Sequence, residues 1–181
     1  MTMSSLRCLL MVAALSAIGS GCAARDAGIA QPPQMAATTT TFVIVRHAEK
    51  GVDDPKDPSV SEIGQARAQR ASERLADKRV AAIYATRYRR TQMTAAKTAQ
   101  AHGLEVTTYD AAQSAADFAA QLRRKHVAGV VLVVGHSNTV ADIAGALCGC
   151  AVTPLREDEY DRWIEIRIGQ NGAAKLEETR Y

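Results

Sequence analysis

Residues 127–135, "VAGVVLVVG", constrain the fold of this chain more than any other segment. The run is apolar on both faces of a strand, so it is expected to lie inside a sheet that is covered on both sides. It stops at His136, the first residue of the polar stretch "HSNT". A strand of this kind indicates a mostly parallel sheet with helices packed on both faces.

From residue 42 onward, strand-like and helix-like segments alternate along the chain. Strands are expected over residues 42–45, 80–86, 104–109, 127–135 and 160–168, with a possible edge strand at 175–181. Helices are expected over residues 61–78, with Ser61 as N-cap, over 90–103, with Gly103 as the stop, and over 115–122. A fourth helix is expected to start at Ser137 and Asn138. This alternation predicts an α/β fold, a sandwich of three layers.

The chain of 181 residues is long enough for one domain with a sizeable core. Residues 1–21 hold an apolar stretch after Arg7 that is too short for a confident membrane span, which is typical of a secretory signal. Residues 22–41 are small, threonine-rich and contain proline, and are expected to form a flexible spacer. The globular domain is then expected to cover residues 42–181.

Cys22 follows Ser20 and Gly21 at the end of the apolar stretch. This arrangement resembles the lipobox of bacterial lipoproteins, although Gly19 stands where that motif usually has leucine. The resemblance predicts an exported, membrane-tethered protein that is lipidated at Cys22. The alternative is an ordinary cleaved signal and a periplasmic or secreted product.

Composition argues against nucleic acid as a partner, and it leaves the pairing of two cysteines open. A net charge of +3 and an aromatic content of 4% argue against a nucleic-acid surface. Cys148 and Cys150 are separated by one residue; they could pair in an oxidising compartment or remain two small buried thiols. No second close-spaced pair of cysteines accompanies them, so a metal site there is not expected.

Polar side chains follow two of the expected strands at their carboxyl ends, Arg46 and His47 after the first and His136 after the central one. In an open α/β sheet these ends meet at one edge, where ligands bind. Guanidinium groups match the oxygens of phosphate, and a neutral imidazole is a nucleophile. The sequence therefore predicts a phosphate site at this edge, strengthened by the N–H groups of the helix expected to start at Ser137 and Asn138.

Four motifs in this order, "VRHAEK", "VSEIGQARA", "YATRYRRTQMTA" and "VVGHSNT", resemble the histidine phosphatase superfamily, also called phosphoglycerate mutase-like, and in particular its short bacterial phosphatases. The resemblance runs from residue 42 to about residue 149. It implies a three-layer α/β/α sandwich with a mostly parallel, six-stranded sheet and one antiparallel strand.

The resemblance also implies roles for individual residues. His47 matches the nucleophile that becomes phosphohistidine, Arg46 and Arg90 match arginines that hold the phosphoryl group, and His136 matches a second histidine that donates a hydrogen bond to it. Met93 replaces the glutamine usual in the motif around Arg90. No cofactor and no metal are expected, because the arginines supply the electrostatic stabilisation. A zinc site of His47, Glu49 and His136 is the alternative.

The acid that protonates a leaving alkoxide is not fixed by these motifs. The family often places a carboxylate after the third strand, where this chain has Asp110; Glu49 and Asp142 are alternatives. Arg87, Arg89, His102 and His126 are expected at the surface, with Arg87 able to line a substrate rim.

The function predicted from the sequence is an exported phosphatase acting on a small phosphomonoester. A phosphohistidine phosphatase and a non-catalytic phosphate-binding lipoprotein are the alternatives. A mutase is disfavoured, because a domain of this length leaves little room for the insertions that cap mutase sites.

Overall fold

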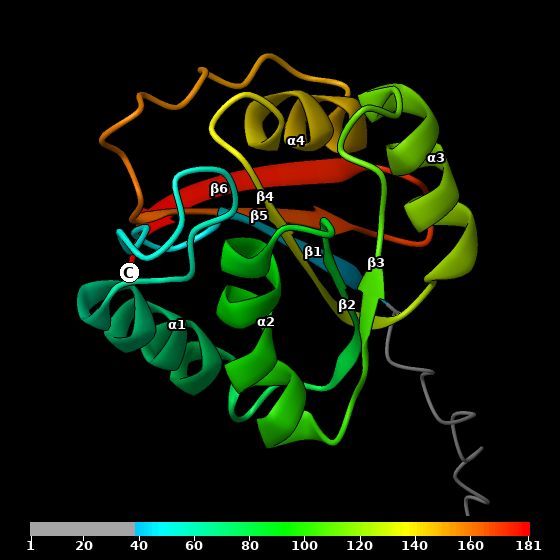
Figure 1. Ribbon diagram of the computed structural model, residues 1–181. Helices are drawn as coiled ribbons and strands as arrows, with labels where there is room; N and C mark the ends of the chain where they lie inside the picture. Colours follow the sequence, from blue (N-terminus) through cyan, green and yellow to red (C-terminus); the bar gives the residue numbers. More distant parts are fainter. Residues whose placement is uncertain (1–38) are drawn as a thin grey trace, which may run out of the picture. The chain divides into compact units, whose positions relative to one another are not determined.

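The apolar segment singled out in the sequence forms an inner strand of a six-stranded sheet (Figure 1). The computed structural model describes residues 39–181. The strands are β1 (Thr40–Arg46), β2 (Val80–Ala85), β3 (Val106–Thr108), β4 (Gly129–Gly135), β5 (Arg162–Ile168) and β6 (Ala174–Arg180). The helices are α1 (Glu62–Leu75), α2 (Arg89–His102), α3 (Ala115–Lys125) and α4 (Val140–Cys148).

The sheet has the strand order β3-β2-β4-β1-β5-β6, so β4 and β1 lie side by side at its centre. β3, β2, β4 and β1 are parallel, and β5 pairs antiparallel with both β1 and β6. Five strands therefore point one way and β5 alone points the other. Arg46 is in register with Gly135, which brings the two polar strand ends to the same level.

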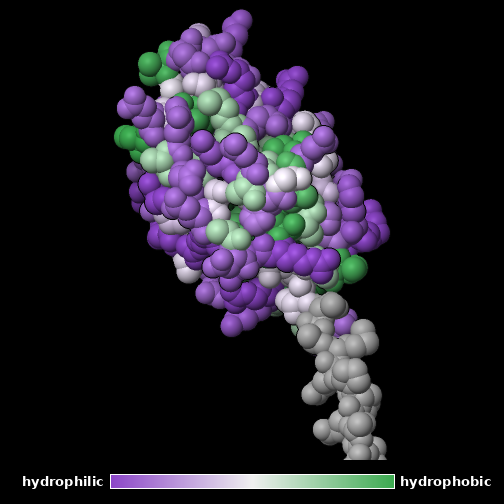
Figure 2. All heavy atoms as spheres, turned by 90° about the horizontal axis from the view of Figure 1, so that it is seen from below, coloured by the Kyte–Doolittle hydropathy of each residue, from purple (hydrophilic) through white to green (hydrophobic). Residues whose placement is uncertain are grey.

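Side chains alternate between two hydrophobic cores along β1. Phe42 and Ile44 belong to the core under α3 and α4, whereas Val43 and Val45 belong to the core under α1 and α2. The two helix pairs lie on opposite faces of the sheet (Figure 1), which confirms the predicted three-layer sandwich. In the view from the side of α1 and α2, hydrophilic residues cover most of the surface, with hydrophobic ones scattered between them (Figure 2).

Local signals set the helix ends close to their expected positions. The Ser61 hydroxyl accepts the N–H of Gly64 at the start of α1. Gly103 ends α2 in the left-handed conformation, with φ 63°, which glycine adopts without a steric penalty. α4 begins later than expected, at Val140 with Thr139 as N-cap, so Ser137 and Asn138 lie in the turn before the helix.

The first strand begins earlier in the chain than expected. β1 starts at Thr40, so the last two residues of the expected spacer belong to the sheet. Their inclusion follows from strand pairing, because Thr40 and Thr41 oppose Gly129 and Val130 of β4.

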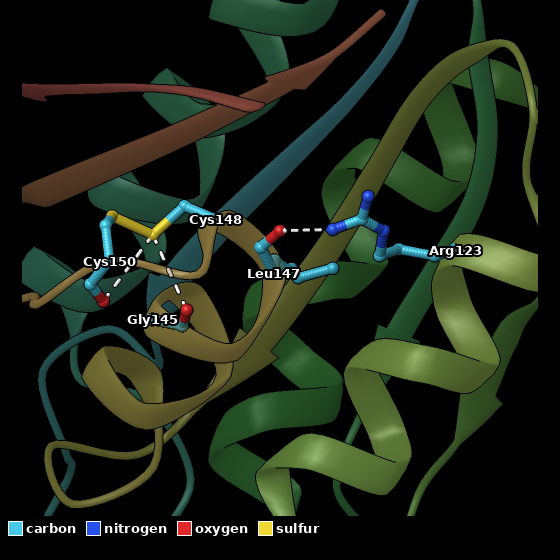
Figure 3. Close-up of a disulfide and its surroundings, with 5 residues drawn as sticks. All are labelled: Arg123, Gly145, Leu147, Cys148 and Cys150. Carbon is cyan, nitrogen blue, oxygen red and sulfur yellow. Dashed lines mark hydrogen bonds between the residues drawn. A yellow bond between two sulfur atoms is a disulfide. The ribbon is translucent and has the colours of Figure 1, made fainter. Parts of the chain in front are cut away.

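Cys148 and Cys150, whose pairing the sequence left open, form a disulfide at the end of α4 (Figure 3). Beside it, the Leu147 carbonyl at the end of α4 accepts a hydrogen bond from Arg123 of α3.

The expected signal segment, most of the spacer and Cys22 lie outside the described residues. Within residues 39–181, no helix combines the length and the apolar character needed to cross a membrane.

Candidate active site

Three elements of the fold bring the predicted phosphate-binding residues together. Arg46 ends β1 and His47 follows it, His136 follows β4, and Arg90 lies in the first turn of α2. All four line one pocket of about 280 Å³. The ring centroids of the two histidines are 5.4 Å apart. The pocket therefore combines two imidazoles with two guanidinium groups, a set of side chains that suits a phosphoryl group.

The His47 ring is held so that one particular nitrogen is free. Its Nδ1 lies 2.8 Å from the carbonyl oxygen of Ala48, which can only accept, so Nδ1 carries the proton. Nε2 then bears a lone pair, and it has no hydrogen-bond partner among residues 39–181. The pKa of His47 is lowered to about 3, chiefly by burial. The hydrogen bond to the Ala48 carbonyl opposes this effect, and the nearby His136, Arg46 and Arg90 add to it. His47 is thus a neutral, nucleophilic imidazole at neutral pH.

His136 is neutral for the same reasons. Burial is the main cause that lowers its pKa to about 4, and Arg90 and Arg46 add to the effect. Its Nε2 lies 3.0 Å from the hydroxyl oxygen of Thr86. A negatively charged phosphoryl group in the pocket would favour the protonated ring, which could then donate a hydrogen bond to it.

These two lowered pKa values predict how stability depends on pH. Between about pH 6.5 and pH 4 the unfolded chain protonates both rings and the folded protein does not, so stability falls as the pH falls. Each ring should contribute a slope of about 1.4 kcal/mol per pH unit in this window and none above it. Urea unfolding of wild type and His47→Gln at pH 7, 6 and 5 tests this prediction. Equal slopes for the two proteins would contradict it.

Arg46 serves both the pocket and the segment between α4 and β5. Its Nη1 lies 3.1, 2.7 and 3.2 Å from the carbonyl oxygens of Arg156, Glu157 and Glu159. Its guanidinium carbon lies 4.0 Å from the centre of the Tyr160 ring. The side chain is 2% exposed. A buried guanidinium thus supplies the hydrogen bonds that this irregular segment needs, and the segment in turn fixes the arginine.

Arg90 is held more loosely. Its Nη1 lies 3.5 Å from Asp57 Oδ1, and its guanidinium carbon lies 4.6 Å from the centre of the Tyr88 ring. The Nε atoms of Arg46 and Arg90 are buried without a hydrogen-bond partner among the described residues. Buried donors of this kind are normally paired. An anion in the pocket would give both arginines an acceptor.

The structure adds one residue to the site, Glu157, that was not expected from the sequence. Glu157 lines the pocket. Its carboxylate accepts one hydrogen bond from the Ser137 hydroxyl at 2.6 Å and one from Arg46 Nη2 at 3.2 Å. The hydrogen bond from Ser137, followed by the charge of Arg46, lowers the pKa of Glu157. It is therefore an ionised carboxylate. The only sequence signal is its place in the acidic stretch "EDEYD", residues 157–161, at the start of the strand expected over residues 160–168.

The three candidate acids lie in different places. Asp110 is exposed and accepts the N–H of Ala112; it lines a hollow next to the histidine pocket, and its neighbour Ala111 lines both. Glu49 points to α1, where Arg67 binds both of its oxygens. Asp142, in the first turn of α4, lines another hollow together with Asp110.

Of the other predicted surface residues, Arg87 and Arg89 are exposed, as expected. Arg89 pairs with Asp53, and Arg87 lines the same hollow as Asp110. His102 and His126 are half-buried rather than exposed, a correction to the prediction. The His126 Nε2 is hydrogen-bonded to Tyr84, because the end of α3 packs over β2. No group of three or more His, Cys, Asp or Glu side chains within residues 39–181 has the spacing of a metal site.

Comparison with known proteins finds a family model that matches part of the domain. Residues 42–113 match the model of the histidine phosphatase superfamily, branch 1. They include Arg46, His47 and Arg90, and the sheet and helices described above agree with this fold. Over these residues the chain is similar to the histidine phosphatase superfamily. No curated protein sequence matches it.

Solved structures of superfamily proteins share the fold. The protein histidine phosphatase SixA complexed with tungstate aligns with a TM-score of 0.61 and 16% identity, over 77% of this chain and 96% of that one. A phosphoserine phosphatase from Entamoeba histolytica in complex with 3-phosphoglyceric acid aligns with a TM-score of 0.60 and 12% identity, over 78% of this chain and 97% of that one. A mycobacterial glucosyl-3-phosphoglycerate phosphatase aligns with a TM-score of 0.56 and 14% identity, over 81% of this chain and 99% of that one. At these identities the likeness concerns the fold.

Proposed function

We propose that this protein is a metal-independent phosphatase that hydrolyses a small phosphomonoester through a phosphohistidine at His47. One observation carries the proposal: the free Nε2 of a neutral His47 shares a pocket with Arg46, Arg90 and His136. The structural neighbours include a protein histidine phosphatase and a phosphoserine phosphatase, which supports the same class of reaction.

The reaction has two displacements. In the first, the Nε2 lone pair of His47 forms a bond to phosphorus while the bond from phosphorus to the leaving oxygen breaks. Arg46 and Arg90 stabilise the charge on the phosphoryl oxygens, and a carboxylic acid protonates the leaving oxygen. In the second, a water oxygen bonds to phosphorus, the N–P bond breaks, and inorganic phosphate leaves.

Trapping of the intermediate tests the proposal. Wild-type protein mixed with radiolabelled p-nitrophenyl phosphate and quenched in alkali should carry label on His47. The label should survive alkali and be lost in acid, which is the behaviour of an N–P bond. Phosphate binding without turnover or label would instead indicate a non-catalytic phosphate-binding protein.

Asp110 is the proposed acid, and its role depends on the leaving group. Asp110→Asn should slow the hydrolysis of alkyl phosphates, such as sugar phosphates, by about 100-fold, because an alkoxide leaves poorly without a proton. It should barely affect p-nitrophenyl phosphate. Steady-state kinetics on both substrates measure the difference, with Asp142→Asn as the matched control. Equal losses on both substrates would reject Asp110.

A phosphohistidine phosphatase is the second candidate. The one carboxylate among the residues lining the described pocket is Glu157, and its lowered pKa makes it a poor proton donor. A phosphoramidate needs less help from a carboxylic acid than an alkyl ester does. A higher kcat/KM on a phosphohistidine peptide than on any sugar phosphate, unchanged by Asp110→Asn, would favour this candidate.

Export and lipidation at Cys22 form part of the proposal and rest on the sequence of residues 1–22. Cys22→Ser should move the protein out of the membrane fraction or leave an uncleaved precursor, because the lipid would have no thiol to modify. Fractionation and mass spectrometry of the N-terminus measure this outcome. A soluble wild-type product that begins at another residue would contradict the lipobox reading.

A further inference from the structure

Two buried threonines form a hydrogen-bonded chain behind His136. The Thr86 hydroxyl oxygen lies 3.0 Å from His136 Nε2 and 2.8 Å from the Thr91 hydroxyl oxygen. The Thr91 oxygen lies in turn 2.7 Å from the Tyr88 carbonyl oxygen and 2.9 Å from that of Thr86. Thr86 is 1% exposed and Thr91 is 0% exposed. These contacts must be satisfied by the protons of the groups themselves, because water does not reach them.

The direction of these hydrogen bonds follows from counting the protons of the groups that make them. Carbonyl oxygens only accept, so the single hydroxyl proton of Thr91 goes to a carbonyl, the nearer being that of Tyr88. The contact between the two hydroxyls then needs the proton of Thr86. Thr86 is left with a lone pair toward His136, so Nε2 must carry a proton and donate it. In this arrangement only the longer contact, between Thr91 Oγ1 and the Thr86 carbonyl, lacks a proton of its own. The opposite arrangement, with Thr86 donating to Nε2, would leave a second buried oxygen–oxygen contact without a proton, which is costly.

We propose that Thr86 and Thr91 are positioning residues that hold His136 as its Nε2–H tautomer and so make Nδ1 the ring atom that meets the phosphoryl group. Nδ1 has no hydrogen-bond partner among residues 39–181, and it is not among the buried unpartnered atoms. When the ring takes up a second proton, that proton goes to Nδ1, which then donates to a phosphoryl oxygen. This consequence for activity rests on the proposed function, whereas the tautomer does not.

The tautomer can be measured without any substrate. In wild-type protein with ¹⁵N-labelled histidine, long-range NMR spectra at pH 7 should show a protonated Nε2 and an unprotonated Nδ1 for His136. The reverse assignment would overturn the proposal. A failure to find any phosphatase activity would count against the proposed function and would leave this measurement unaffected.

Thr91→Val gives the sharpest variant, because Thr91 does not touch His136. Without the Thr91 oxygen, the proton of Thr86 turns to His136 Nε2, and the Nδ1–H tautomer should gain population in the same spectra. On activated phosphates, kcat should fall about tenfold, a loss that corresponds to one misdirected hydrogen bond. Thr91→Ser keeps the oxygen and should restore both the spectrum and kcat. Thr86→Val should lower kcat at least as much, with rescue by Thr86→Ser.

Thr98 supplies the matched control. It lies on the same helix, is 0% exposed, and its hydroxyl is buried without a partner among the described residues. Thr98→Val removes the same atoms and should change neither the His136 spectrum nor kcat. If Thr91→Val behaves like Thr98→Val in both measurements, the threonine chain does not position His136 and the proposal is wrong.

Discussion

Replacing His47 with alanine is expected to abolish turnover of phosphorylated substrates while leaving the fold and phosphate binding in place. His47 supplies the only atom proposed to bond to phosphorus, so kcat should fall by about 10⁴-fold or more. The ring follows the last residue of β1, and its one hydrogen bond joins it to the adjacent Ala48. Its removal also ends the cost of burying a titratable group, so the loss of stability should be small.

Three measurements decide this prediction. Steady-state kinetics give kcat, calorimetry gives the affinity for inorganic phosphate, and circular dichroism follows unfolding. His126→Ala is the matched control, since His126 lies at the end of α3 and lines a different pocket with Thr40 and Phe42. It should keep full activity. A His47→Ala protein that retains activity would refute the phosphohistidine mechanism.

Arg46→Ala and Arg90→Ala are expected to lower catalytic efficiency alike but to differ in their effect on the free energy of unfolding. Both remove one positive charge from the pocket and should lower kcat/KM by about 10³-fold, because that charge acts on the ground and transition states alike. Only Arg46→Ala removes the side-chain donor shared by the carbonyl groups of Arg156, Glu157 and Glu159. Of these, the Arg156 carbonyl still accepts the N–H of Glu159. It should lower the free energy of unfolding by about 3 kcal/mol or more.

The two variants serve as each other's control. Urea unfolding should show a much smaller loss for Arg90→Ala, whose side chain is 15% exposed and makes a long contact with Asp57 besides packing over the Tyr88 ring. Inorganic phosphate should stabilise wild type and fail to stabilise either variant at the same concentration. Equal stability of the two variants would show that the hydrogen bonds of Arg46 to the segment before β5 contribute nothing measurable.

The sequence was informative where a local pattern carries the information. The apolar run before His136 predicted an inner strand, and the motif around Arg90 predicted the start of a helix; both lie where they were expected. Because the carboxyl ends of parallel strands share one edge, the meeting of Arg46, His47 and His136 could also be predicted. Ser61 and Gly103 set helix ends through caps that depend on neighbouring residues alone.

Long-range contacts of irregular segments could not be predicted in this way. Arg46 and the carbonyl of Glu157 are 111 residues apart, and no periodicity links them. The pairing of Cys148 and Cys150 was left open because one intervening residue permits both states. Each of these contacts depends on the path of a loop, which the sequence pattern of helices and strands leaves undetermined.

β1 runs from Thr40 to Arg46, so the first residue of the domain and the phosphate pocket lie at opposite ends of one strand. Seven residues of extended chain place them about 20 Å apart. A bead, a surface or a fused protein coupled upstream of Thr40 therefore joins the domain at the far end of the sheet. Bulky substrates such as phosphorylated proteins would approach the pocket from the free side, and immobilised enzyme should keep its access to them.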